Sequence, residues 1–208
     1  MNNTTKRILT SIVMIAIIGA AAYFGFIRYL TIAIAVIMGL EILHGKIKAK
    51  ARWPLWANFG FFSYWIIFII SAYFAGAKPW VMLLLFMIIA ATDTGAWFFG
   101  KNFGGDKLWP SVSPGKTWSG HIAGLICGTF AGIMYGLLGT DVFLASLMWI
   151  GIGVATLSQY GDLAASWMKR KIGIKDFANT LPGHGGFADR FDGWIFVLPI
   201  IWLALTIR

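Results

Sequence analysis

The sequence predicts an all-α membrane protein, a polytopic transmembrane bundle of about seven helical spans. Two observations predict this class. Of the 208 residues, 59% are hydrophobic and only 12% are charged, whereas soluble domains carry about 25% charged residues. The apolar residues also form runs near the length of helix that crosses about 30 Å of hydrocarbon. A chain this apolar has too little polar surface to cover a globule of its size.

Seven apolar segments are the candidate spans. They cover residues 8–27, 29–43, 55–75, 79–100, 119–138, 142–163 and 191–207. We expect a single membrane domain over residues 1–208, with N-terminal spans in 8–90 and catalytic spans and loops in 91–208. No internal repeat or low-complexity tract divides the chain.

The first and last predicted spans each have an unusual feature. The first follows Lys6 and Arg7 as the apolar core of a signal peptide would, but apolar residues continue to Ile27 and more spans follow. We therefore expect an uncleaved first span. The last span is short and contains Pro199, which can kink a membrane helix without breaking it.

The basic residues predict the orientation. With the N-terminus inside, the inside segments hold 14 of the 17 Lys and Arg residues, and the outside segments hold Arg28, Lys78 and Arg208. The positive-inside rule favours this arrangement, with the C-terminus outside. Basic residues that set the membrane orientation and contact anionic lipid headgroups account for the net charge of +9. We therefore expect no nucleic-acid partner. The one cysteine, Cys127, excludes an intramolecular disulfide and a cysteine zinc site, and indicates small-residue helix packing.

The inside loops 101–118 and 164–190 are the segments long and polar enough to build a site. Four carboxylates lie at the span ends beside them: Asp93, Asp162, Asp189 and Asp192. Charged groups near the membrane are costly and are functional by default. The alternatives are that Asp162 caps a helix or pairs with Lys169, and that Asp192 caps the last helix.

The spacing of two of these carboxylates indicates a cation. Asp189 and Asp192 are i and i+3 at the start of the last span, so they would share a helical face. Two carboxylates on one face repel each other unless a cation lies between them. Oxygen ligands without a histidine or cysteine cluster favour Mg²⁺ over zinc or copper.

Basic residues and glycines accompany the carboxylates. The basic residues of the second loop are Lys169, Arg170, Lys171, Lys175 and Arg190. With a metal ion, such cations suit a polyphosphate, although the run 169–171 alone is typical of anionic lipid binding. In LPGHGG, residues 181–186, the glycines let the backbone approach an anion. His184 lies between them and could contact a phosphate or relay a proton; the alternative is a plain re-entry turn.

The first loop contains SPGKT at residues 113–117. It is not a P-loop, because no glycine lies five residues before Gly115 and we expect no preceding strand. Lys116 followed by a hydroxyl, just before a helix N-terminus, remains a reasonable phosphate contact.

Residues 166–192, SWMKRKIGIKDFANTLPGHGGFADRFD, resemble the signature of the phosphatidate cytidylyltransferases at every fixed position over 27 residues. Three further blocks are similar to that family: DTGAW at 93–97, SPGKTW at 113–118 and GDL at 161–163. The resemblance covers about residues 90–193. The chain departs from the usual pattern at Phe177 and Ala178, in place of serine and glycine, and at Ser119, in place of glutamate. It is also shorter than typical members, which implies missing N-terminal spans.

The resemblance implies the reaction CTP + phosphatidate → CDP-diacylglycerol + diphosphate, with Mg²⁺ and with a second cation left open. It implies metal ligation by Asp162, Asp189 and Asp192; catalytic roles for Asp162, Lys175, His184, Asp189 and Arg190; and substrate contacts from Asp93, Ser113, Lys116, Ser166, Lys169, Arg170, Gly185 and Gly186. The partners would be CTP, phosphatidic acid in the bilayer and other membrane lipids, with a homodimer left open. The expected location is a bacterial inner membrane, with the active site facing the cytoplasm.

Two other interpretations remain open from the sequence. A CTP-dependent polyprenol kinase or another lipid cytidylyltransferase would share the metal site and differ in the lipid acceptor. An ion-coupled transporter would use the carboxylates as an ion site. Against a transporter, the carboxylates gather near one face rather than the midplane, and the discontinuous helix pairs typical of transporters are not evident.

Overall fold

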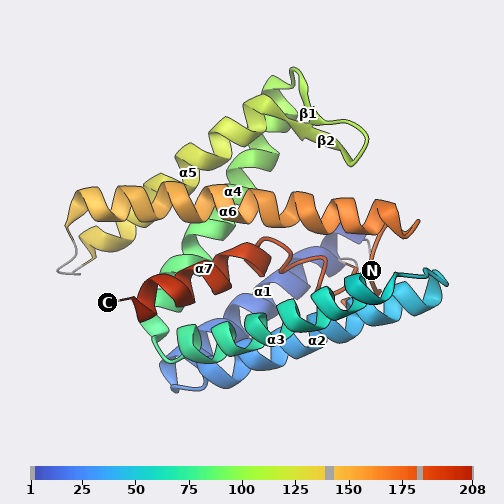
Figure 1. Ribbon diagram of the computed structural model, residues 1–208. Helices are drawn as coiled ribbons and strands as arrows, with labels where there is room; N and C mark the ends of the chain where they lie inside the picture. Colours follow the sequence, from blue (N-terminus) through green and yellow to red (C-terminus); the bar gives the residue numbers. More distant parts are fainter. Residues whose placement is uncertain (1–2, 139–142, 182–184, 208) are drawn as a thin grey trace. The chain divides into compact units, whose positions relative to one another are not determined.

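The computed structural model describes residues 3–138, 143–181 and 185–207 (Figure 1). The elements in chain order are α1 (Asn3–Tyr23), α2 (Ile27–Lys48), α3 (Leu55–Gly76), α4 (Pro79–Phe103), β1 (Lys107–Trp109), β2 (Ser113–Thr117), α5 (Trp118–Leu137), α6 (Leu144–Lys171) and α7 (Trp194–Thr206). Each helix covers one predicted span, so the all-α class and the order of the elements are confirmed. The main difference in length is α6, which continues eight residues past the predicted end at 163.

Four of the described helices are long and apolar enough to cross a membrane: α2, α3, α4 and α5. The apolar part of α1 and the whole of α7 are shorter, at Ile12–Tyr23 and Trp194–Thr206. The chain therefore has the character of a helical membrane protein, while the count of seven spans stays a prediction.

Contacts divide the chain into two compact units. The first unit comprises Met1–Val81 and Met168–Arg208, and the second comprises Met82–Trp167. Helix α6 contributes residues to both. The predicted single domain stays a prediction.

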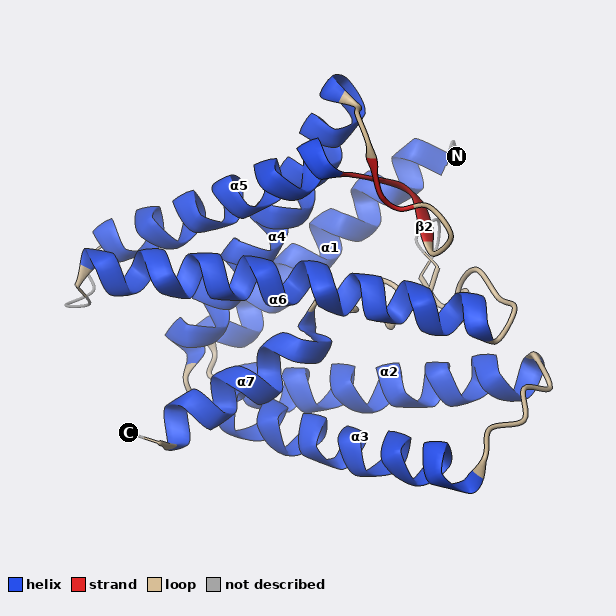
Figure 2. Ribbon diagram, turned by 45° about the horizontal axis from the view of Figure 1, so that its top comes forward, coloured by secondary structure: helices blue, strands red, loops and turns tan. Residues whose placement is uncertain are grey.

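In the first unit, α2 and α3 lie side by side and α7 packs on α3 (Figure 2). The indole nitrogen of Trp65 on α3 donates to the carbonyl of Ala35 on α2 at 3.0 Å. A Cβ at Gly39 would lie 2.1 Å from that nitrogen, so α2 needs a glycine at this crossing. The hydroxyl of Tyr64 donates to the carbonyl of Ile195 and links α3 to α7.

In the second unit, α5 presents glycine at every fourth position: Gly120, Gly124, Gly128, Gly132 and Gly136, all buried. A Cβ at Gly120 would lie 2.6 Å from the carbonyl oxygen of Ala96 on α4, and one at Gly128 would lie 3.0 Å from the Cβ of Ala155 on α6. Small residues at four-residue spacing let membrane helices approach closely. The predicted small-residue packing at Cys127 is confirmed, because its side chain lies against Gly95 of α4.

Two glycines of α6 test this packing. A Cβ at Gly151 would lie 2.8 Å from the Cα of Thr129 on α5, whereas one at Gly153 would meet nothing within 4 Å. We expect Gly151→Ala to lower the thermal unfolding midpoint, because overpacking costs about 1–3 kcal/mol against a gain in helix propensity of about 1 kcal/mol. Gly153→Ala should leave the midpoint unchanged or raise it. Tryptophan fluorescence of the detergent-solubilised protein measures both midpoints, and equal shifts would contradict the packing.

The first loop folds as an antiparallel hairpin, in which Lys107 pairs with Thr117 and Trp109 with Ser113. The expectation of no strand before SPGKT was therefore wrong, because the motif itself is the second strand of this hairpin. Thr117 begins α5 as its N-cap, and its side chain accepts a hydrogen bond from the backbone of Gly120 at 3.2 Å. The missing glycine still excludes a P-loop.

Candidate functional site

Asp189 is the centre of the signature segment in the first unit. One carboxylate oxygen accepts from the Lys169 ammonium at 2.8 Å, and the other accepts from the backbone N–H groups of Phe177 and Gly186 at 3.0 and 3.1 Å. The side chains of Lys169 and Asp189 are only 9% and 3% exposed. A single buried carboxylate thus joins the end of α6, the segment after it and the glycine turn.

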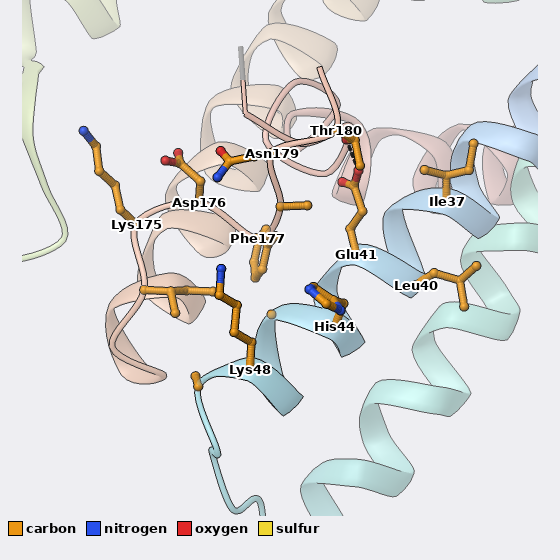
Figure 3. A pocket seen from close by; sticks show the side chains of 14 residues that line it. Ile37, Leu40, Glu41, His44, Lys48, Lys175, Asp176, Phe177, Asn179 and Thr180 are labelled. Carbon is orange, nitrogen blue, oxygen red and sulfur yellow. Dashed lines mark hydrogen bonds between the residues drawn. The ribbon is translucent and has the colours of Figure 1, made fainter. Parts of the chain in front are cut away.

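Glu41 of α2 is a second buried carboxylate in the same segment, and it is 5% exposed. Its Oε2 accepts from the backbone N–H of Ala188 at 2.7 Å, and its Oε1 accepts from the Thr180 hydroxyl (Figure 3). The sequence alone predicts no role for Glu41, which lies near the end of the predicted span 29–43. The signal that could have found it was a lone carboxylate in an otherwise apolar helix.

Two of the three glycines of the signature turn, Gly185 and Gly186, have a structural explanation. Gly185 has φ +84°, a left-handed conformation that side-chain-bearing residues rarely adopt. A Cβ at Gly186 would lie 2.5 Å from the Glu41 Oε2. The backbone N–H of Gly186 donates to a carboxylate of the chain itself, Asp189, and the predicted contact with a ligand anion stays a prediction. His184 lies outside the described residues.

In the second unit, Asp162 of α6 pairs with Lys116 of β2, with 2.6 Å between Oδ2 and Nζ. The Ser166 hydroxyl, one turn along α6, donates to Oδ1 of Asp162 at 3.3 Å. The side chains of Lys116 and Asp162 are 26% and 32% exposed, so a ligand can reach both. The alternative pairing of Asp162 with Lys169 is wrong, because each has a different partner.

The other predicted residues occupy more open positions. Asp93 on α4, Arg170 at the end of α6, and Lys175 and Arg190 in the signature segment are exposed, while Ser113 on β2 is half-buried. The Arg170 guanidinium donates to the carbonyl of Ile174 at 3.1 Å. These cations can therefore contact a solvent-borne or headgroup phosphate.

The predicted helical pairing of Asp189 and Asp192 is wrong. Both lie in turns before α7, which begins at Trp194 with Gly193 as its N-cap. The Asp192 carboxylate accepts from the N–H of Gly193 at 2.9 Å, so it does not cap α7 in the predicted way. The argument from repulsion on one helical face therefore falls.

The three predicted metal ligands are divided between the units, with Asp162 in the second and Asp189 and Asp192 in the first. Among the described residues, no group of three or more His, Cys, Asp or Glu side chains lies close enough to hold a metal ion. The magnesium site stays a prediction.

The departures from the usual signature have structural roles. Phe177 is 2% exposed, and its ring lies 5.4 Å from the Lys169 ammonium, so it covers the buried ion pair. The Ser119 hydroxyl lies 3.0 Å from that of Thr117 and donates to the carbonyl of Gly104, which links the start of α5 to the residue that follows α4. Phe177 replaces an uncharged residue of the usual pattern, whereas Ser119 replaces a glutamate.

Known proteins resemble part of the chain. A stretch of 125 residues is 42% identical to the phosphatidate cytidylyltransferase of Staphylococcus saprophyticus subsp. saprophyticus, covering 60% of this chain and 48% of that protein. Over 128 residues it is 44% identical to the phosphatidate cytidylyltransferase of Staphylococcus aureus, with the same shares covered. The chain thus spans about half the length of these curated relatives. The cytidylyltransferase family matches residues 40–208, which include both Glu41 and the signature. The chain belongs to the cytidylyltransferase family.

Proposed function

We propose that the chain is a phosphatidate cytidylyltransferase, which converts CTP and phosphatidate to CDP-diacylglycerol and diphosphate. The observation that carries the proposal is the signature segment 166–192. Its fixed positions Lys169, Gly186 and Asp189 make the buried contacts that hold the segment together. The relatives named for this activity are 42–44% identical to the chain over 125–128 residues.

The chemistry needs positioning more than acid–base catalysis. A lipid phosphate oxygen attacks the α-phosphorus of CTP, a new P–O bond forms, and the bond to the β-phosphate breaks as diphosphate leaves. The attacking phosphate is already anionic, so no general base is needed. In-line orientation and stabilisation of charge on the diphosphate supply the catalysis. The accessible cations Lys116, Arg170, Lys175 and Arg190 are the groups that would contact the phosphates.

Magnesium would supply charge neutralisation at the phosphates, and a second cation is left open. The donor set fits it, because Asp162, Asp189 and Asp192 offer oxygen ligands without cysteine or histidine. Asp162 already attracts a cationic group, the Lys116 ammonium, to a reachable oxygen. The Asp189 carboxylate is mostly engaged by the chain itself, so its contribution to a metal would come from its remaining lone pair.

We place the protein in a bacterial inner membrane, with about seven spans and the signature on the cytoplasmic side, where CTP is found. The support is that 14 of the 17 Lys and Arg residues lie in the segments assigned to that side. Acyl chains would stay in the bilayer during turnover. Attaching cysteine-reactive labels to single-cysteine variants of the inside and outside loops would test this orientation.

Labelled nucleotides test the reaction itself. Purified protein is incubated with Mg²⁺, phosphatidic acid and CTP labelled in the cytidine ring, and we expect the label to enter a lipid product. CTP labelled at the γ-phosphate should leave the lipid unlabelled. Lipid labelling from the γ-phosphate would instead support a lipid kinase, and no lipid labelling from either nucleotide would favour the transporter.

A further inference from the structure

An open groove of about 840 Å³ lies in the first unit, between α2 and the segment that follows α6. One wall is a face of α2, and the other is residues 174–180, which include Lys175 and Phe177 (Figure 3). None of the predicted metal ligands lines it. The groove is therefore distinct from the predicted metal ligands, although Phe177 lines it and also contacts the Lys169–Asp189 ion pair.

The α2 wall changes in character along its length. Ile37 and Leu40 line one end and His44 and Lys48 the other, at spacings that keep them near one helical face. Leu40 is 61% exposed, in a helix long enough to cross a membrane. The apolar end is therefore open to lipid, and the basic end lies at the helix terminus, where a membrane interface would lie.

The basic end has charge available for a ligand. Lys48 and Lys175 lie on opposite walls, are both exposed, and make no ion pair with a described residue. Two carboxylates also line the groove. Both carboxylate oxygens of Glu41 already accept hydrogen bonds, from the N–H of Ala188 and the hydroxyl of Thr180. Asp176 is exposed and lies next to Lys175 in the chain. In Figure 3 the Lys48 amine points toward the opposite wall, whereas the Lys175 side chain extends away from Lys48.

We propose that this groove binds the lipid substrate, with a phosphatidate acyl chain along Ile37 and Leu40 and its phosphate at the basic end, where Lys48 and Lys175 line the groove. The identity of the lipid rests on the proposed function. A phosphomonoester carries close to two negative charges near neutral pH, more than the single charge of a phosphodiester lipid. Two lysines from opposite walls complement that charge, and an apolar wall of one helical face complements a chain.

Photo-crosslinking tests the site without turnover. The full-length protein in nanodiscs, without CTP, is irradiated with phosphatidate carrying a diazirine in one acyl chain. We expect labelled peptides that contain residues 37–48 or 174–180. Unlabelled phosphatidate should suppress this labelling, while phosphatidylglycerol should suppress it much less and glycerol 3-phosphate, which lacks the chains, hardly at all.

Two matched variants test the role of charge. Lys48→Gln should weaken the competition by phosphatidate about fivefold, the effect of one interfacial basic residue. Lys50→Gln makes the same charge change on an exposed neighbour that does not line the groove, and it should have no effect. Leu40→Gln should weaken labelling at the apolar end. Equal effects of the two lysine variants, or equal competition by phosphatidylglycerol, would overturn the proposal.

The crosslinking test of the groove and the labelled-nucleotide test of the reaction can fail independently of each other. Cytidine transfer to lipid, combined with labelling only outside the groove, would overturn the groove and leave the transferase standing. Groove labelling that phosphatidate suppresses, without any cytidine transfer, would support the lipid site and count against the transferase.

Discussion

Replacing Asp189 by asparagine is expected to abolish cytidylyl transfer and also to destabilise the first unit. Asparagine has one carbonyl oxygen, so its NH₂ group must face either the Lys169 ammonium or the backbone N–H groups of Phe177 and Gly186. Leaving one partner of a buried ion pair uncompensated costs about 3–5 kcal/mol. Displacing the segment should also lower kcat by about 100-fold or more. Lipid labelling by cytidine-labelled CTP and the thermal midpoint measure the two effects.

A second substitution separates the structural role of Asp189 from a role in metal binding. In Lys169→Met combined with Asp189→Asn, the asparagine oxygen can accept the two backbone N–H groups while its NH₂ faces an apolar side chain. This double variant should unfold at a higher temperature than Asp189→Asn alone and should stay inactive. Asp106→Asn, at an exposed position of the first loop, is the control for loss of one carboxylate. A midpoint unchanged from wild type in Asp189→Asn would show that the buried hydrogen bonds contribute nothing to stability.

The helices could be predicted from the sequence because each depends on local information. Runs of apolar residues, with loops such as 101–118 between them, mark the ends of the helices within about five residues, except that α6 continues eight residues past its predicted end. The hairpin was missed because Lys107–Trp109 is only three residues long and contains no alternating pattern that distinguishes it from a loop. The glycines of α5 were visible in the sequence, but which helices they contact depends on tertiary packing.

The candidate site was predictable in its residues and less so in their roles. The signature identified Lys169, Gly186 and Asp189, but nothing in their spacing indicates that they contact one another in a buried cluster. The expected helical pairing of Asp189 and Asp192 failed because the chain stays in turns until Gly193. Glu41 was missed because it lies 147 residues before its backbone partner Ala188, a separation that a single sequence does not reveal.

Glu41 is expected to be a positioning residue. The activity of its variants should therefore depend on whether the new side chain keeps the two hydrogen bonds, and not on whether it keeps the negative charge. Glu41→Ala leaves the N–H of Ala188 without its acceptor and removes the partner of Thr180, at a cost of about 1–3 kcal/mol. The turn that carries Asp189 then loses its anchor on α2, and we expect kcat to fall by about 100-fold. In Glu41→Gln, the amide oxygen can accept from Ala188, and the NH₂ group can donate to the Thr180 hydroxyl, which rotates to accept. This variant should keep most of the activity.

Steady-state kinetics with both substrates distinguish positioning from direct contact. If Glu41 acted through its charge, as a metal or substrate ligand would, Glu41→Gln would lose as much activity as Glu41→Ala. A double-mutant cycle of Glu41 and Gly186 tests the close approach of these two residues, because a Cβ at Gly186 would lie 2.5 Å from the Glu41 Oε2. Gly186→Ala should therefore lower kcat strongly in the wild type and much less in the Glu41→Ala background, where the space is open. Additive losses in the double variant would mean that the two residues act separately, and the turn would then owe its position to Asp189 alone.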